Sequence, residues 1–492
     1  MLRQTHRPAW LLFLSVWWTS AYFFHPEPGW NVNSRLNLTY AIVDFGSFEI
    51  TPYLTDRAYF TQDVAYFNGR YYSDKIIGVS LLGVPAYWGL RLVCDALDIT
   101  PSPAVRRYVT RTFSVSVCAA LAVVVMFFVL QRLGIEERPA FFTSLLVHFG
   151  TLLFPYSTLY YPYSAATLFA LLSFYQMLRL VAVEQPGAAG VFLSGLAMGA
   201  SLLCEYIYIW IFLALWMYLA ARTWHRLGRR RALLLLYPLG AGLPLLVFAA
   251  YLISIFGTIV LPYQFETHPS FEGMKENLGF GRPRLSVLYF ITVHPYRGVL
   301  IQSPFLIAAG LGVARAFRRT SPWRHEAALS LALIVIYLLF NSSYYMWWGG
   351  WAMGPRHLIP MLPFWGLWFA AAWRQSGGVE RWLWGGLAAL SVIMVGVPAM
   401  IDPQIPQGYV PEILHEARIG KNLKNPAYYA AFPAFMRGAL APNFLTFIWP
   451  EAGLAALVPL AAVWGGVAWL GGRWIGGRGS GTEAGKGDGM DK

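Results

Sequence analysis

The chain has 492 residues, of which 57% are hydrophobic and only 12% are charged, and its mean hydropathy is +0.48. Soluble domains carry about 25% charged residues, so this chain lacks the polar surface that a soluble enzyme of its length needs. The composition therefore predicts an integral membrane protein. A net charge of +13 would suit nucleic acid, but the placement of the basic residues indicates membrane topology instead, and we expect no nucleic-acid partner.

Twelve apolar segments are candidate membrane spans, each near the roughly 20 residues that cross the hydrocarbon core. The first, 9–25, follows a basic N-terminus and has no small-residue cleavage site after it, so we expect an uncleaved span. The others are 109–130, 140–154, 164–181, 188–204, 206–222, 232–256, 299–314, 326–341, 358–373, 382–400 and 452–471. The predicted fold is an all-α polytopic membrane protein with about twelve spans (about 11–13).

Segment 76–94 is apolar enough to be a thirteenth span, and the charge pattern decides its place. If it lies on the outer surface as an interfacial helix, the arginine clusters at 222–231 and 315–324 face the cytoplasm, as the positive-inside rule requires. If it crosses, both clusters face outward. We therefore expect a surface helix at 76–94 and both termini in the cytoplasm.

This topology predicts a single transmembrane domain over 1–472. Its first extracytoplasmic loop is 26–108, and further outer regions are 257–298 and 401–451. The Gly-rich remainder, 473–492, is expected to be a disordered cytoplasmic tail. No Walker loop, HExxH or GxSxG motif is present, which counts against nucleotide-driven transport, zinc proteolysis and the α/β-hydrolase mechanism.

The outer segments carry the candidate site residues. In the first loop, acids and a lysine stand directly before the surface helix, where a carboxylate can act as a base while a cation holds a lipid phosphate. Arg297 and Arg356 stand at the outer ends of later spans, and Glu205 lies at an outer turn, where it either pairs with an arginine or contacts substrate. The loop 154–164 has tyrosines and no charge, which suits interfacial anchoring or a wall for a sugar or lipid.

The segment DVAYFNGRYYSDKIIGVSLLGVP resembles the first loop of bacterial GT-C membrane glycosyltransferases, which include protein O-mannosyltransferases and aminoarabinose transferases. PYRGVLIQSP and WWGGWAMGPRHLIPMLPF are similar to other parts of that group. The resemblance implies inverting transfer of a sugar from a polyprenyl-phosphate donor to a glycan, lipid or protein acceptor on the outer face. It also implies a first-loop carboxylate as base, sometimes near a divalent metal such as Mg²⁺ or Mn²⁺.

Where many members of the group have an Asp-Glu pair, this chain reads Asn33-Ser34-Arg35. The base is therefore expected elsewhere, and Asp44 and Asp63 both remain candidates. The predicted residues for the donor and its phosphate are Tyr72, Asp74, Lys75, Glu205, Arg297 and Arg356.

The composition and the resemblance together predict a multi-pass enzyme of the bacterial inner membrane that works among membrane lipids. A lipid or glycolipid transporter without glycosyl transfer is the alternative.

Overall fold

The computed structural model describes residues 6–25, 29–350, 352–404 and 426–476. These residues are mostly helical, and their one sheet is a two-stranded hairpin of β1 (Val64–Phe67) and β2 (Arg70–Ser73). The hairpin is the one departure from the predicted all-α fold within the described residues. The N-terminal helices are α1 (His6–Tyr22), α2 (Trp30–Phe45), α3 (Gly78–Ala96), α4 (Pro103–Thr112), α5 (Val115–Arg132), α6 (Glu137–Phe149), α7 (Leu153–Ser157) and α8 (Tyr163–Leu180).

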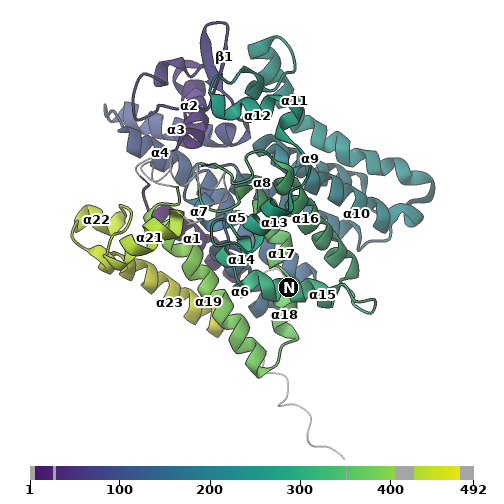
Figure 1. The fold of residues 1–492 in the computed structure, drawn as a ribbon. Coiled ribbons are helices and arrows are strands. Elements are labelled where there is room, and N and C mark those ends of the chain that lie inside the picture. The colour runs from purple at the N-terminus through teal and green to yellow at the C-terminus, as the bar shows by residue number, and fades with distance from the viewer. Residues whose placement is uncertain (1–5, 26–28, 351, 405–425, 477–492) are drawn as a thin grey trace, which may run out of the picture.

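The remaining helices complete a bundle under the outer segments (Figure 1). The middle of the chain forms α9 (Ala188–Cys204), α10 (Ile209–Leu227), α11 (Leu236–Phe256), α12 (Glu272–Lys275), α13 (Leu285–Thr292), α14 (Val299–Gln302), α15 (Phe305–Ala316) and α16 (Arg324–Ser343). The C-terminal part forms α17 (Leu362–Gly366), α18 (Phe369–Arg374), α19 (Gly378–Ile401), α21 (Pro426–Met436), α22 (Phe444–Ile448) and α23 (Val458–Gly476). Short 3₁₀ turns that bear on the site are η1 (Thr51–Tyr53), η2 (Tyr206–Tyr208), η4 (Pro262–Phe265) and η7 (Arg356–Met361).

Each predicted span coincides with one helix or with a run of short helices. Among the described residues, five helical stretches are both long and apolar enough to cross a membrane: Pro103–Arg132, Tyr206–Phe256, Arg324–Ser343, Gly378–Ile401 and Gly453–Gly472. Ala188–Cys204 and Phe305–Ala316 are apolar but shorter. The fold is that of a helical membrane protein, and the count of twelve spans stays a prediction.

Helix α9 packs closely against α11 because two glycines face the partner backbone. A Cβ atom on Gly195 would lie 2.0 Å from the carbonyl oxygen of Tyr237, and one on Gly199 would lie 2.3 Å from that of Ala241. Small residues four apart let helices approach within a membrane, where dispersion contacts replace the hydrophobic effect as the driving force. Helices α8 and α5 continue this packing toward α1.

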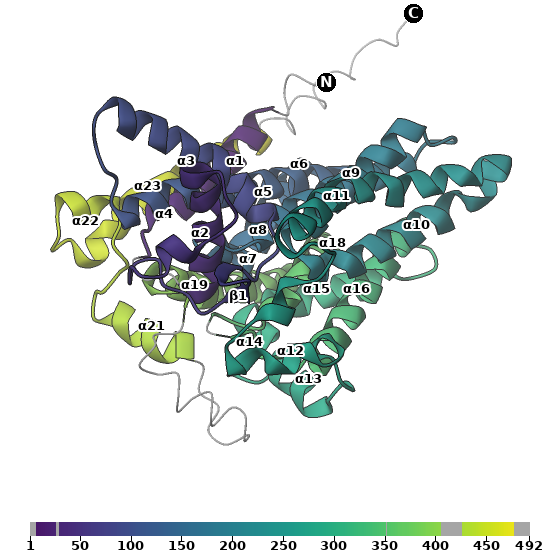
Figure 2. The ribbon, with the colours of Figure 1, turned by 90° about the horizontal axis from the view of Figure 1, so that it is seen from above.

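The first outer segment forms a cap over the bundle rather than an extended loop (Figures 1 and 2). Helix α2 is largely buried, and α3, which takes the place of the predicted surface helix 76–94, packs against α2 and α4. Part of the predicted outer region 401–451 lies outside the described residues, and its described part contains α21 and α22. The predicted tail begins inside α23, which ends at Gly476, and the rest of that tail lies outside the described residues.

Candidate active site

The β1–β2 hairpin brings two aspartates together. Asn68 and Gly69 both have positive φ (49° and 78°), as a two-residue type I′ turn requires. The resulting register pairs Val64 with Ser73, so Asp63 and Asp74 lie side by side at the open end of the hairpin. The sequence FNGR therefore fixes the spacing of two carboxyl groups that are eleven positions apart in the chain.

Lys75 lies between these two carboxylates. Its ammonium nitrogen is 2.9 Å from Asp63 Oδ2, and it also donates a hydrogen bond to Asp74 Oδ2. Ser34 of α2 donates a hydrogen bond to the other oxygen of Asp74 at 3.1 Å. Asp63 is 5% exposed and Asp74 is 9% exposed, so these charges meet largely out of water.

The pKa values of the cluster follow from burial and from this close pairing. Burial raises the pKa of Asp63, and Lys75 offsets only part of that effect. Burial acts in the same direction on Asp74, but the charge of Lys75, the hydrogen bonds from Glu266 and Lys75 and the charge of Arg35 together outweigh it and lower the pKa of Asp74. Burial disfavours the charged form of Lys75, yet the surrounding carboxyl groups prevail and raise its pKa. At neutral pH the cluster therefore holds a charged lysine beside an aspartate whose pKa lies above its usual range.

Glu266, which the sequence analysis did not select, joins this cluster from the second outer region. An isolated β-bridge pairs it with Ala65 of β1. Burial, followed by the negative charge of Asp74, raises the pKa of Glu266 to about 11, so this side chain is neutral at physiological pH. The sequence around Glu266 does not indicate a role in the site, because the residues that it meets there, Asp74 and Ala65, lie about two hundred positions away in the chain.

Arg35 and Glu205 form a second buried pair next to the cluster. The Arg35 guanidinium lies 3.8 Å from the Glu205 carboxylate, which stands at the C-terminal end of α9. Burial raises the pKa of Glu205, although the positive charges of Arg35 and Arg356 oppose that shift. Two consecutive residues of α2 thus contribute to the candidate site, with Ser34 on Asp74 and Arg35 on Glu205.

Arg356 presents a guanidinium group to the same region. Its carbon Cζ lies 5.7 Å from the ring centre of Tyr161, and its positive charge acts on both Asp63 and Glu205. Its Nε is buried and has no hydrogen-bond partner among the described residues. A half-buried guanidinium with an unused donor is suited to an anionic ligand.

Arg297 holds the loop from which Arg356 extends. It donates hydrogen bonds to the backbone carbonyls of Gly354 at 2.9 Å, of Gly350 at 3.1 Å and of Ala352. The side chain is 1% exposed. A Cβ atom on Gly349 would lie 2.9 Å from Cγ of Arg356, so the glycines leave room for that side chain. Arg297 therefore acts on Arg356 through the loop backbone.

The structure places Asp44 in a different set of contacts. Its carboxylate accepts hydrogen bonds from the hydroxyl groups of Tyr53 at 2.8 Å and Tyr87 at 2.9 Å. Arg91 and Arg106 lie 3.6 and 3.9 Å away, so Asp44 links α2, η1, α3 and α4. Its described partners are all outside the cluster around Lys75.

Tyr72, on β2, likewise makes its described contacts away from Lys75. Its backbone pairs with Glu49, and its ring lies 6.2 Å from that of Phe256. Its neighbour in sequence, Ser73, is the residue of β2 that hydrogen-bonds within the cluster, to Ser34 at 2.8 Å.

The carboxyl groups of the cluster do not fit a divalent metal in this arrangement. Among the described residues, no three His, Cys, Asp or Glu side chains are grouped as metal ligands. Asp63 and Asp74 are turned toward the ammonium of Lys75, and the proton held by Glu266 removes its charge. Hard cations such as Mg²⁺ need charged oxygen ligands that are free to coordinate.

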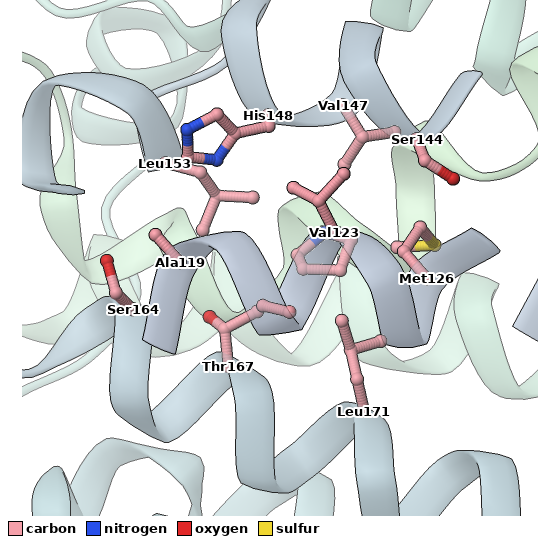
Figure 3. Close-up of a pocket in the computed structure, with 12 residues that line it drawn as sticks. Ala119, Val123, Met126, Ser144, Val147, His148, Leu153, Ser164, Thr167 and Leu171 are labelled. Atoms are coloured by element: carbon pink, nitrogen blue, oxygen red, sulfur yellow. The ribbon is translucent and has the colours of Figure 1, made fainter. Parts of the chain in front are cut away.

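A small pocket inside the bundle is separate from this cluster. Side chains of α5, α6 and α8 point into it, including Val123, His148 and Thr167 (Figure 3). None of the candidate site residues is among the described residues that line it. We therefore assign it to the packing of the spans.

Comparison with known proteins supports the resemblance drawn from the first loop. Residues 53–272 match the model of the family described as dolichyl-phosphate-mannose-protein mannosyltransferase. The matched segment includes Asp63, Asp74, Lys75, Glu205 and Glu266. The predicted resemblance to GT-C membrane glycosyltransferases is thus confirmed. No curated protein matches the chain.

Among solved structures, the chain is similar to the archaeal oligosaccharyltransferase AglB from Archaeoglobus fulgidus, in complex with an inhibitory peptide and a dolichol-phosphate. The identity is 11%, the TM-score is 0.47, and the match covers 87% of this chain. The chain spans 61% of the length of that protein.

Proposed function

From the site geometry and the family match, we propose that this chain transfers a sugar from a polyprenyl-phosphate donor to an acceptor on the extracytoplasmic face. The reaction inverts the anomeric carbon. The observation that carries the proposal is the charged Lys75 next to Asp63, whose pKa is raised, with Arg356 acting on the same aspartate.

In the proposed mechanism, Asp63 is the base and Asp44 is structural. Asp63 takes the proton from the acceptor hydroxyl while the hydroxyl oxygen attacks the anomeric carbon. The bond from that carbon to the phosphate oxygen breaks, and polyprenyl phosphate leaves with its negative charge. A general base works best when its pKa lies close to the ambient pH, so the raised pKa of Asp63 favours it over a fully paired carboxylate.

Lys75 and Arg356 stabilise the departing phosphate. Developing negative charge on a leaving group is stabilised most by cations that are already held in place. Lys75 is fixed by Asp63 and Asp74, and Arg356 is fixed by Tyr161 and by the loop that Arg297 holds. Asp74 and Arg297 then act as positioning residues.

The remaining parts of the proposal follow from the topology. The chain crosses a bacterial inner membrane about twelve times with both termini in the cytoplasm, so the cluster faces outward. The sugar is a hexose or pentose, and the acceptor is a glycan, a lipid or a protein. Mannose is the first sugar to test because the matched family is named for it.

The test is transfer of labelled mannose from a polyprenyl-phosphate donor to cell-envelope acceptors in proteoliposomes. General-base catalysis contributes about 10²–10⁴-fold, so Asp63→Asn should lose at least about 100-fold of the wild-type turnover. Asp44→Asn, compared at equal amounts of folded protein, should keep most of it. Full turnover in Asp63→Asn would exclude the mechanism, and movement of labelled lipid without a new glycosidic bond would favour the transporter.

A further inference from the structure

A long cavity of about 1320 Å³ lies between α1, α6, α19 and α23. Helices α19 and α23 each pack against α6, and α19 runs from the region of α21 to the end of the bundle near α18 (Figure 1). Among the described residues that line this cavity, none belongs to the candidate active site. The groove is therefore separate from the cluster around Lys75 and does not depend on the proposed function.

The walls of the groove are apolar along most of their length. On α19 the lining extends from Arg381 to Met400, nineteen positions that span about 28 Å at 1.5 Å per residue. This length is close to the roughly 30 Å of a bilayer's hydrocarbon core. Gly385 and Gly396 line the groove, and a Cβ atom on either would meet nothing within 4 Å. An open apolar channel offers water too few polar partners, so it is suited to hydrocarbon chains.

One end of the groove is basic. Arg138 in the first turn of α6, Arg374 at the end of α18 and Arg381 in the first turn of α19 all line it and are all exposed. The one acid among the described lining residues is Glu136. None of these three arginines forms an ion pair with another described residue.

Glu380, the acid next to Arg381 on α19, already forms an ion pair with another arginine. Glu380 lies 3.4 Å from Arg315, so it does not neutralise Arg381. An apolar groove that ends at three arginines and a single glutamate, with no ion pair to these arginines among the described residues, matches a molecule with a hydrocarbon body and an anionic head. Arginine binds phosphate oxygens with two parallel hydrogen bonds, which makes it the residue best suited to such a head group.

We propose that this groove binds an anionic phospholipid, with its phosphate at Arg138, Arg374 and Arg381 and its acyl chains along α19. Charge complementarity selects the head group, because the cationic part of a zwitterionic lipid is repelled by the same three arginines. The open space beside Gly385 and Gly396 accommodates the chains.

The test is lipid binding by native mass spectrometry of the full chain in detergent. We expect phosphatidylglycerol to bind about tenfold more tightly than phosphatidylcholine with the same chains, since each basic residue near a head group adds several-fold to affinity. The variant R138Q/R374Q/R381Q should lose this preference. The control variant R229Q/R230Q/R231Q removes three exposed arginines that do not line the groove and should keep it.

A second variant tests the channel itself. Gly385→Leu with Gly396→Leu adds side chains where a Cβ atom would meet nothing within 4 Å, and it should weaken binding of both phospholipids. Equal binding of the two lipids by the wild type would overturn the proposal. So would a preserved preference in the triple glutamine variant, tighter binding of polyprenyl phosphate than of phosphatidylglycerol, or a dimer of the chain that excludes lipid from the groove.

Discussion

Replacing Lys75 with methionine removes the ammonium between Asp63 and Asp74 and tests the electrostatic account of the site. The methionine keeps most of the side-chain volume but leaves two buried carboxylates facing each other. Removing one partner of a buried ion pair costs about 3–5 kcal/mol, because the remaining charge has lost its compensation. We therefore expect a marked loss of thermal stability in Lys75→Met.

The loss of stability in Lys75→Met should depend on pH. One of the two carboxyl groups can take up a proton and remove the repulsion, so the cost of that protonation is the upper bound on the loss. With the ordinary aspartate pKa of 3.8, holding one carboxyl protonated costs about 4 kcal/mol at pH 7 and about 2 kcal/mol at pH 5. Because this cost scales with the distance of the pH from the pKa, the upper bound on the penalty falls by roughly 60% between pH 7 and pH 5. In the wild type, Asp74 has a lowered pKa, so its stabilising contribution is present at both pH values and is lost only in more acidic solution.

The assay is thermal unfolding of the purified chain in lipid nanodiscs from pH 5 to pH 8. Lys275→Met is the matched control, because Lys275 is an exposed lysine on α12 that makes no ion pair with a carboxylate of the described residues. The melting-temperature deficit of Lys75→Met should shrink by more than half from pH 7 to pH 5, as the protonation cost does. A deficit that does not change with pH, or one that Lys275→Met reproduces, would refute the reasoning.

Individual contacts lead to four further predictions. Asp44→Asn should lower the melting temperature by the equivalent of about 1–3 kcal/mol and leave turnover per folded molecule within a few-fold of wild type; an unchanged melting temperature would contradict the structural role. In Arg297→Lys, the lysine cannot reach all three backbone carbonyls that Arg297 binds, so turnover should fall by about tenfold or more. Lys75→Arg keeps the positive charge and should therefore retain more activity than Lys75→Met. The pKa of Glu266 is about 11 in the folded chain and about 4.5 in the unfolded chain. Between these pH values only the folded chain keeps this proton, so the free energy of unfolding should fall as the pH rises. Glu266→Gln should flatten this decline between pH 7 and pH 9, and equal slopes for variant and wild type would exclude the assignment.

Much of the fold could be predicted from sequence because its signals are local. Apolar runs located the segments that form the helices of the bundle, and the low charge indicated that lipid is the solvent for much of the chain. The first outer segment was predicted only in outline. Its helix α2 contains Asn33 and Arg35, which interrupt any apolar pattern, and it is stabilised by burial under the hairpin and α3. The hairpin has a local signal in Asn68-Gly69, but strand pairing was not part of the prediction.

For the site, the sequence placed Asp63, Asp74 and Lys75 in one short segment before the predicted surface helix, and the hairpin then brings the two ends of that segment together. The sequence left Asp44 and Asp63 as equal candidates, because their surroundings come from other parts of the chain. Only the tertiary structure brings Arg356 and Glu266 to Asp63 and gives Asp44 its tyrosine and arginine partners. The physical reason is that burial and Coulomb forces depend on distance in space, whereas a sequence pattern records only distance along the chain.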